Sequence, residues 1–489
     1  MKEIVESYFK QRSLVNHQLM SYNDCIPSGD GRLSRMERIV RSIRIGTDEP
    51  VEDLPGGEEA GGCIKLDVLD KEIIVRLKGI RLGRPTIREA NGAEHPATPL
   101  ECRIRKLTYF SPVYMDFRIY RDDIEGPSDG GLGWVEEEGV HIGNLPIMVR
   151  SARCNLHSDH IDENRKLSPQ SSEEDAEYLK ELLRKSGEDP LDPGGYFIIN
   201  GTERVLISME DLAPNRVTVE KNKKYAHETE VAKIFSQRDG VRKPINVEKR
   251  RDGMLMVKIP SAGTTAIPVV LLMRALGMEN DQEIFASIAG PVEAMKYTVA
   301  NLNDVKDNDE YGVETEEEAV AWLEKKFAAG QQKEYRESRI QNLLDKELLP
   351  HLGSSDEHRE KKAIFLGRIV RQVLEMAITD RDPNDKDHYA NKRVRLAGDL
   401  MEDLFRVSLQ QLARDLKYQL ERHHNRKREL KINSCLRPDV LTSKIMHALA
   451  TGNWVGGRSG VSQLLDRTTF IAALSDMRRV TSPLVRSQP

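Results

Sequence analysis

The segment from about Gly398 to Arg422 carries a long, regular row of apolar side chains. The row consists of leucines and one phenylalanine spaced close to i, i+4: Leu400, Leu404, Phe405, Leu409, Leu412, Leu416 and Leu420. This spacing places the apolar side chains on one face of a long amphipathic helix. A chain of 489 residues is long enough to bury such a face in an ample core without disulfides or metals.

Size and composition restrict the class of protein. At about 100–200 residues per domain, the chain allows three or four domains. The longest clean apolar run, Ala266 to Met273, is far shorter than the roughly 20 residues of a membrane span. The first residues lack the apolar region of a secretory signal. The five cysteines are scattered without a C-x-x-C pair, which suits reduced thiols in a cytosol. We therefore expect a cytoplasmic protein with no membrane partner.

The charge is distributed unevenly along the chain. Residues 401–489 contain 15 lysines and arginines against 8 acidic residues, whereas the whole chain contains 74 against 79. A basic C-terminal segment on an acidic body is compatible with one face that meets nucleic acid. Charge alone leaves local fluctuation as an equal alternative.

Two hairpins are the most specific local signals. Asn200-Gly201 separates the segments 196–199 and 204–207, and this dipeptide fits a tight primed turn. A second hairpin is expected where residues 250–253 separate residues 245–247 from 254–259.

The remaining segments predict a mixture of helices and strands. Strands are expected over residues 64–69, 73–77, 103–109 and 114–119, and helices over residues 1–27, 172–185, 269–277, 316–328 and 360–378. Thr315 with Glu318 offers a capping box for one of these helices, and Ser172 is a plausible cap for another. Residues 48–62 are acidic and rich in glycine and proline, which is typical of a loop. The pattern predicts a multi-domain α+β fold, and the lack of a fixed period argues against solenoids and propellers.

Several catalytic motifs are missing from the sequence. It has no P-loop, no G-x-G-x-x-G opening a helix after a strand, no G-x-S-x-G and no H-E-x-x-H. A self-contained hydrolase, kinase or dehydrogenase is therefore poorly supported.

Two polar clusters invite a metal hypothesis. Cys154, His157, Asp159 and His160 lie within seven residues, but no second Cys/His segment offers further zinc ligands, so a polar turn is the better interpretation. His423-His424 sits among basic residues at a helix end, where it complements the helix dipole. We predict no metal ligand and no catalytic residue in this chain.

Residues 385–395, DKDHYANKRVR, pack acids, bases and an aromatic side chain closely together. A catalytic interpretation would use Asp385 or Asp387 with His388. The alternative is a charge-balanced turn that leads into the amphipathic helix, and composition alone does not decide between them.

The C-terminal stretch 448–479 is the most informative part of the chain. Three glycines around Arg458 predict a flexible loop whose backbone can approach a ligand closely. Gln463, Arg467, Arg478 and Arg479 supply amide and guanidinium donors that suit phosphate and sugar contacts. The competing interpretation is a surface helix with solvated arginines.

Several blocks resemble, in the right order, the second-largest subunit of multisubunit DNA-dependent RNA polymerases. They lie at residues 103–116, 141–151, 194–207 (GGYFIINGTERVLI), 385–398, 448–454 (ALATGNW), 460–463 (GVSQ) and 478–479. Together they span roughly residues 100–480 and correspond to the N-terminal half of that subunit. Because the chain ends at Pro489, it resembles the B double-prime subunit of archaea in which this subunit is split.

The resemblance implies a protrusion with an inserted lobe, followed by a fork domain. It assigns residues 1–207 and 385–428 to the protrusion, 208–384 to the lobe and 429–489 to the fork. The fork would lie beside the DNA–RNA hybrid, with Gly456 to Gly460 facing the edge of the bubble. The nucleic-acid contacts that we expect are Arg458, Gln463, Arg467, Arg478, Arg479, Lys392 and Arg393. Asp476 replaces a usual histidine, which weakens any claim for that position.

The resemblance also implies partners and a division of labour. We expect this chain to support template-directed RNA synthesis as a subunit of archaeal RNA polymerase, without being catalytic alone. The expected protein partners are B-prime, A-prime (which is the largest subunit) and the D–L platform, together with the DNA template and the nascent RNA. The metal-binding acidic motif of the family is absent here, so no cofactor is expected on this chain and Mg²⁺ is expected on the largest subunit.

Two other functions remain as alternatives. The first is a stand-alone nucleic-acid-binding protein with the same architecture. The second, much weaker, is a metal-dependent nuclease that uses the Asp385–His388 cluster.

Overall fold

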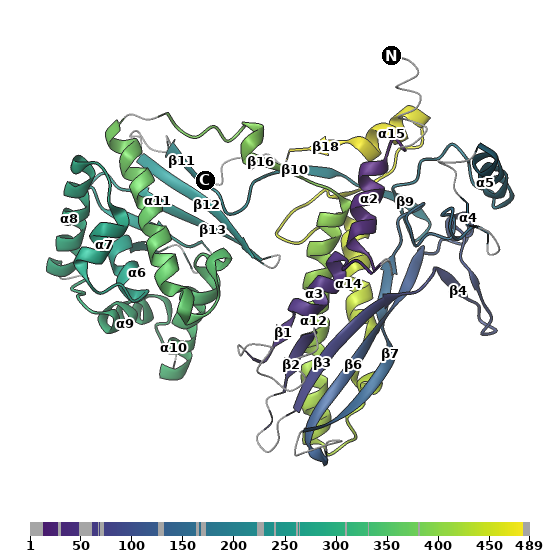
Figure 1. Ribbon diagram of the computed structural model, residues 1–489, viewed down its shortest axis with the longest axis horizontal. Coiled ribbons are helices and arrows are strands. Elements are labelled where there is room, and N and C mark those ends of the chain that lie inside the picture. The colour runs from purple at the N-terminus through teal and green to yellow at the C-terminus, as the bar shows by residue number, and fades with distance from the viewer. Residues whose placement is uncertain are drawn as a thin grey trace. The chain divides into compact units, whose positions relative to one another are not determined.

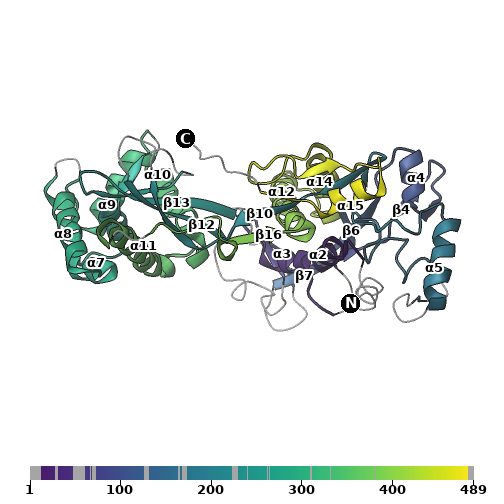
Figure 2. The ribbon, with the colours of Figure 1, turned by 90° about the horizontal axis from the view of Figure 1, so that it is seen from above.

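A computed structural model describes most of the chain and divides it into two units. The described residues are 13–27, 31–47, 61–66, 68, 73–125, 132–162, 166–167, 173–222, 229–238, 241–260, 263, 265–308, 311–330, 332–379 and 382–482. Unit 1 comprises residues 1–211 and 394–489, and unit 2 comprises residues 212–393 (Figures 1 and 2). Unit 2 is thus inserted into unit 1. The mixed α+β, multi-domain fold class is confirmed.

Unit 1 is built on a five-stranded sheet. Its strands are β1 (Arg44–Ile45), β2 (Gly62–Lys65), β3 (Ile73–Leu82), β6 (Phe110–Glu125) and β7 (Leu132–Pro146), in the order β1-β2-β3-β6-β7. All neighbouring strands are antiparallel except β1 and β2. The long strands β3, β6 and β7 lie side by side in Figure 1.

The predicted amphipathic helix is confirmed as α12 (Ala397–Asn425). All seven apolar residues of the predicted row are buried, and they join the core of unit 1. Helix α2 (Asn16–Cys25) crosses the start of α12 so closely that a Cβ on Gly398 would lie 1.9 Å from the Ser21 carbonyl oxygen. Glycine is therefore the side chain that this crossing admits. Helices α3 (Arg35–Ser42), α13 (Ile432–Cys435) and α14 (Pro438–Thr451) complete the helical layer.

The Asn200-Gly201 hairpin is also confirmed. Strands β8 (Phe197–Ile199) and β9 (Thr202–Leu206) pair across it, and both turn residues have positive φ, 50° and 76°. Positive φ at both central positions is what a type I′ turn requires. The smaller elements of unit 1 are β4 (Thr86–Arg88), β5 (Glu94–Pro96), α4 (Pro99–Ile104), α5 (Glu173–Lys185), β10 (Ser208–Leu212), β17 (Ser462–Leu464), α15 (Phe470–Arg478) and β18 (Val480–Thr481).

Unit 2 has its own sheet and its own core. The sheet is an antiparallel meander of β11 (Val217–Asn222), β12 (Thr229–Arg238), β13 (Val241–Lys249), β14 (Leu255–Lys258) and β15 (Ala266–Pro268). Its helices are α6 (Val269–Ala275), α7 (Asp281–Ile288), α8 (Val292–Asp307), α9 (Glu316–Phe327), α10 (Lys333–Asn342) and α11 (Arg359–Thr379). Short helical turns cover Leu343–Glu347, Pro350–Leu352, Asp356–His358 and Tyr389–Asn391, and β16 (Lys392–Arg395) follows. The second hairpin, three predicted helices and the Thr315–Glu318 capping box are confirmed here.

One predicted strand is wrong. Residues 103–109 were expected to be extended, but α4 ends at Ile104 and Lys106 turns the chain with a φ of 55°. Thr98 caps α4 by accepting a hydrogen bond from the Glu101 amide, and Pro99 occupies its first turn. These start signals outweigh the alternating pattern that follows them.

Some expectations concern residues outside the described part of the chain or are left open by the fold. Residues 1–12, 48–60 and Ser172 lie outside the described residues. Residues 429–489 belong to the same unit as residues 1–211. The names protrusion, lobe and fork stay predictions. Among the helices that are described, none combines the length and apolar character needed to cross a bilayer.

A buried glutamine joins the separate segments of unit 1. The Gln18 Nε2 group donates to the Leu206 carbonyl (3.2 Å), the Ser208 hydroxyl (3.0 Å) and the Met477 carbonyl (3.4 Å). Its Oε1 atom accepts from the Ala397 amide at 3.1 Å. Gln18 is 1% exposed, so these groups have little access to water. One side chain thus ties α2 to the end of β9, to β10, to α15 and to the start of α12.

We expect Gln18→Leu to destabilise unit 1 by about 2–5 kcal/mol, because it leaves several buried polar groups without partners. The measurement is chemical denaturation followed by a signal from unit 1, with Gln410→Leu, on a partly exposed position of α12, as the control. Equal stability of the two variants would contradict the central role of the amide.

Candidate nucleic-acid interface

Five of the seven predicted contact residues lie in unit 1 and two lie in unit 2. Strand β17 brings residues 462–464 to the Asn-Gly hairpin by pairing antiparallel with β9, with Gln463 opposite Val205. The Leu465 amide extends this pairing to the Glu203 carbonyl at 3.0 Å. The hairpin is therefore the platform on which the C-terminal segment is mounted.

The predicted glycine-rich loop leads into β17 and is anchored at its base. The Trp454 indole is buried and donates to the Leu400 carbonyl at 2.9 Å. The Val461 amide donates to the Gly452 carbonyl at 3.2 Å, which closes the loop. Gly456 and Gly457 have positive φ and open space around the Cβ position. Their backbone conformation, rather than lack of room, is the reason for glycine there.

Arg458 is held inside the loop instead of pointing freely to solvent. Its side chain is 16% exposed, and its Nη2 atom lies 2.6 Å from a carboxylate oxygen of Asp211. Its Nη1 atom lies 4.0 Å from Asp403, which is itself paired with Arg395 at 2.8 Å. The charge of Arg458 is therefore offset within the chain.

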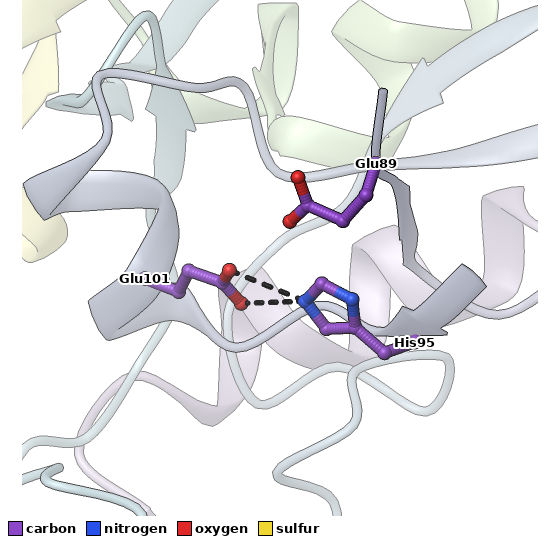
Figure 3. A group of neighbouring side chains, drawn as sticks. All are labelled: Glu89, His95 and Glu101. Carbon is purple, nitrogen blue, oxygen red and sulfur yellow. Dashed lines mark hydrogen bonds and ion pairs between the residues drawn. The ribbon is translucent and has the colours of Figure 1, made fainter. Parts of the chain in front are cut away.

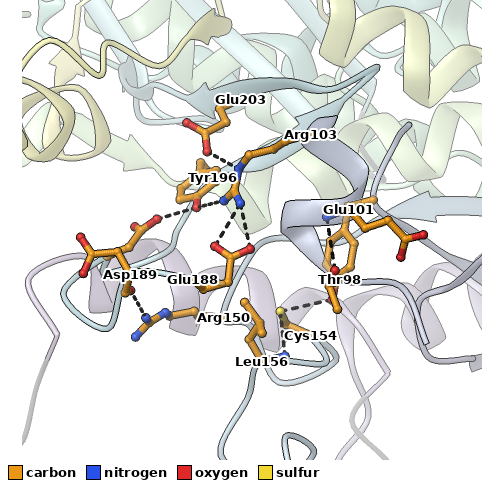
Figure 4. A network of polar contacts seen from close by, with 12 residues as sticks. Thr98, Glu101, Arg103, Arg150, Cys154, Leu156, Glu188, Asp189, Tyr196 and Glu203 are labelled. Carbon is orange, nitrogen blue, oxygen red and sulfur yellow. Dashed lines mark hydrogen bonds and ion pairs between the residues drawn. The ribbon is translucent and has the colours of Figure 1, made fainter. Parts of the chain in front are cut away.

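Arg467 belongs to a dense network around Tyr196, part of which is drawn in Figure 4. The Arg467 guanidinium donates to Glu203 (2.6 Å) and to Asp192 (3.1 Å), and it lies 4.7 Å from the centroid of the Tyr196 ring. Burial works against its charge, but the hydrogen bond to Glu203 and the charge of Asp192 raise the pKa of Arg467. The Nη1 group of Arg467 takes part in neither the bond to Glu203 nor the bond to Asp192.

Arg103 holds the other side of the same network. It donates to Glu203 (2.7 Å), to Glu188 (2.8 Å) and to the Tyr196 hydroxyl (2.8 Å), as Figure 4 shows. Burial raises the pKa of Tyr196 well above its ordinary value, so the ring stays neutral. Two arginines thus share Glu203, and the C-terminal segment is joined to the hairpin by an ion pair that spans 264 residues of sequence.

Arg478 is the last residue of α15, Arg479 follows it, and both are exposed. Arg478 donates to the Leu14 carbonyl at 3.2 Å. Arg479 lies 2.5 Å from Asp476 and 3.5 Å from the Gln463 amide oxygen. The buried Asp476 also accepts from the Asp466 amide, so this acid orients the two segments that carry Gln463 and Arg479. The structure therefore brings Gln463 and Arg479 together.

Lys392 and Arg393 lie in unit 2 on β16. Lys392 is 3.7 Å from Asp387, and Arg393 is exposed and donates to the Lys392 carbonyl at 2.8 Å. The neighbouring Asp385 accepts from the Asp387 amide, and His388 accepts from the Ala390 amide. These local bonds are typical of a turn, and Asp385 and His388 are used within it.

Of the residues weighed as zinc ligands, Cys154 and His160 have separate partners, while His157 and Asp159 lie 3.6 Å apart. The Cys154 thiol accepts a hydrogen bond from the Tyr109 hydroxyl and another from the Leu156 amide. His160 lies 3.0 Å from the Ala152 carbonyl through Nε2. Burial raises the pKa of the Cys154 thiol, which keeps it protonated. These contacts fit the polar turn.

Within the described ranges, one group has the spacing of metal ligands, and the sequence analysis missed it. Glu89, His95 and Glu101 approach one another at the β4–β5 hairpin and α4, with His95 Nε2 at 3.2 Å from Glu101 (Figure 3). Arg105 donates to Glu89 at 2.5 Å and to Glu101 at 2.7 Å. These bonds to Arg105 lower the pKa of both carboxyl groups. The arginine already supplies the positive charge, so the group is an ion-pair network.

Sequence reasoning found the cations of this region but missed their partners. Asp192, Glu203 and Asp211 lie in segments that the sequence shows only as strands and loops. No local spacing connects them with Arg458 or Arg467, because the pairs form only through the tertiary fold. The signals nearby were the glycine-glycine-tyrosine block at residues 194–196 and the Asn200-Gly201 hairpin.

Comparison with known proteins gives one consistent result. The profile of the family described as RNA polymerase beta subunit matches residues 13–443. The Rpo2N subunit of DNA-directed RNA polymerase from Halobacterium salinarum is 42% identical over 502 residues, covering 100% of this chain and 84% of that relative. Rpo2N of Methanocaldococcus jannaschii is 42% identical over 489 residues and is covered to 88%. The longer Rpo2 of Saccharolobus solfataricus is 40% identical, and this chain covers 38% of it.

We expect Glu203→Gln to loosen the C-terminal segment, because the change removes the charge that two partly buried arginines share. Breaking one side of such a network costs about 3 kcal/mol. The Leu465 amide donates to the Glu203 carbonyl, so its hydrogen exchange should become faster when the pairing of β17 with β9 opens more often. Thermal unfolding and hydrogen exchange measure the two effects.

Glu89→Gln is the matched control, since Glu89 pairs with Arg105 in an exposed setting. Unchanged exchange at Leu465 in Glu203→Gln would show that backbone pairing alone holds β17.

Proposed function

The chain belongs to the RNA polymerase beta subunit family, and within that family we propose that it lines the DNA-binding cleft beside the DNA–RNA hybrid. It is a subunit of an archaeal DNA-directed RNA polymerase, a nucleotidyltransferase complex, and it corresponds to the N-terminal half of the second-largest subunit. The alternative of a stand-alone nucleic-acid-binding protein is not favoured by these relatives.

The proposed role is to hold nucleic acid without performing the chemistry. Nucleotidyl transfer in such a complex uses metal ions that stabilise the attacking and leaving oxygens. The one group with ligand spacing among the described residues, Glu89 with His95 and Glu101, is filled by Arg105 and does not fit this task. We therefore assign no chemical step to this chain and the Mg²⁺ to the largest subunit.

One observation carries the proposal: an arginine pair exposed at the end of α15, beside a glutamine on a strand fixed to the hairpin. Arg478, Arg479 and Gln463 present donors that suit phosphate and sugar oxygens. Arg458 and Arg467 act mainly by fixing the glycine-rich loop and the segment that follows it, since carboxylates offset their charges. Lys392 and Arg393 form a second proposed contact on unit 2.

The remaining parts of the proposal concern domains, partners and location. Residues 1–207 and 385–428 form the protrusion, 208–384 the lobe and 429–489 the fork. The exposed apolar side chains Phe470 and Ile471 on α15 are 52% and 76% accessible, and B-prime covers them. The other partners are A-prime (the largest subunit), the D–L platform, template DNA and nascent RNA, in the cytoplasm.

Affinity purification of the tagged chain from archaeal cells, followed by mass spectrometry, tests this role. We expect the other polymerase subunits in near-stoichiometric amounts, because a true subunit is bound through large, stable interfaces. Recovery of the chain alone, or with nucleic acid but no other part of the polymerase, would revive the stand-alone alternative.

Replacing Arg478 and Arg479 by alanine should shorten the lifetime of elongation complexes to a similar degree on unrelated templates. The dependence of stability on salt should fall by roughly one unit per lost phosphate contact. Lysine should restore part of the effect, because it keeps the charge and loses the planar fork.

The control is Arg81→Ala with Arg88→Ala, two exposed arginines that each pair with one acid elsewhere in unit 1. An unchanged salt dependence together with lower thermal stability would make Arg478 and Arg479 structural residues.

A further inference from the structure

The solvent-facing side of α12 carries a row of basic side chains. Arg414, Tyr418 and Arg422 follow one another at i, i+4 and i+8, and all three are exposed, with Tyr418 at 59%. Arg426, Lys427 and Arg428 continue the row past the end of the helix and are also exposed. Residues four apart are neighbours on a helix surface. We call these six residues the basic stripe, and Figure 1 shows α12 running along unit 1.

The cations of the basic stripe lack acidic partners within the described chain. Arg414, Arg422, Arg426, Lys427 and Arg428 form no side-chain hydrogen bond or ion pair with any described residue. Other cations nearby are paired: Arg437 with Asp415 at 2.8 Å, and Lys431 with Glu429 at 3.0 Å. The stripe therefore differs from Arg458 and Arg467, whose charges are offset by carboxylates.

Lys444, on the neighbouring helix α14, lies close to the first arginine of the basic stripe. Lys444 of α14 donates to the Gln411 side chain at 2.6 Å, which places its ammonium group beside the start of the stripe. Burial and then the charge of Arg414 lower the pKa of Lys444. The ammonium group of Lys444 thus lies close enough to Arg414 for the two like charges to repel each other.

The helix dipole does not account for this arrangement. Cations in the last turn of a helix offset the partial negative charge of its C-terminus, but the effect falls off within that turn. Arg414 lies three turns before α12 ends at Asn425, so its charge does not serve to offset the dipole at the C-terminus of the helix. Five cations also exceed the roughly half charge that a helix end presents.

We propose that the basic stripe binds the phosphate backbone of duplex DNA, at a site separate from the residues 458–479. The inference rests on the proposed function, because it takes the enzyme's DNA as the polyanion. From Arg414 to Arg426 the helix rises about 18 Å, roughly half a turn of B-form DNA. A rigid row of cations positions a duplex without reading its sequence. One exposed tyrosine among five cations is not the series of aromatic platforms that single strands require.

The test uses the polymerase assembled with the full chain. The variant Arg414→Gln, Arg422→Gln, Arg426→Gln removes three charges from the stripe and keeps polar, helix-compatible side chains. The control is Lys325→Gln, Lys361→Gln, Arg368→Gln, which removes three exposed charges from helices α9 and α11 of unit 2. Affinity for short duplexes of two unrelated sequences is measured from about 50 to 200 mM salt.

We expect the stripe variant to lower the slope of log affinity against log salt by about 2–3 units, since each phosphate contact contributes about 0.9. The loss should be the same for both sequences, and the control variant should match the unmodified enzyme. An unchanged slope with unchanged thermal stability would overturn the proposal. An unchanged salt slope together with loss of binding to poly-glutamate would also overturn it, and would identify an acidic protein surface as the partner.

Failure of the proposed function has a different signature. If the proposed function is wrong, the unmodified chain will not assemble with the polymerase subunits. In the test of the basic stripe, assembly of the stripe variant is verified before DNA is added. A variant that assembles fully and binds DNA as the unmodified enzyme does contradicts only the basic stripe.

Discussion

The amide of Gln18 is the constraint on which the arrangement of unit 1 depends. It is buried, and its two polar atoms satisfy groups of residues as distant in sequence as Ala397 and Met477. A buried polar atom without a partner costs more than a hydrogen bond gains, so the segments that supply the partners must all arrive together. The positions of β9, β10, α12 and α15 are therefore coupled. The position of the C-terminal segment is set in part by its hydrogen bond from Gln18 to the Met477 carbonyl.

The same logic separates the arginines into two groups. Arg103 and Arg467 share Glu203, and Arg458 takes Asp211, so their charges are offset inside the molecule. Such pairs contribute little net stability, because desolvation offsets the attraction, but they fix one geometry against others. Arg479 is also paired, with Asp476, but its side chain is 50% exposed, so its remaining donors and the exposed Arg478 are left at the surface. The basic charge of residues 401–489 is thus divided between arginines paired within the molecule and arginines at the surface.

What the sequence predicted well is local, and what it missed is not. The row of apolar residues predicts α12, and Asn200-Gly201 predicts its hairpin, because the determining residues are neighbours. The expected strand at 103–109 failed since capping by Thr98 overrode the alternating pattern. The nucleic-acid contacts expected near the C-terminus follow from residue type and from resemblance, and they stay a prediction. The acidic partners of these residues were not predicted, because an ion pair across 264 residues leaves no mark in local spacing.

The position of Arg458 links the glycine-rich loop to the insertion of unit 2. Asp211 is the last residue of unit 1 before the chain leaves for unit 2, and Arg395 follows directly after it returns. Arg458 pairs with Asp211 and approaches Asp403, which in turn pairs with Arg395. A shift of either end of the insertion must therefore strain a charge-assisted bond in a largely buried setting. One chain of charges thus links the loop arginine to the residues on both sides of the insertion.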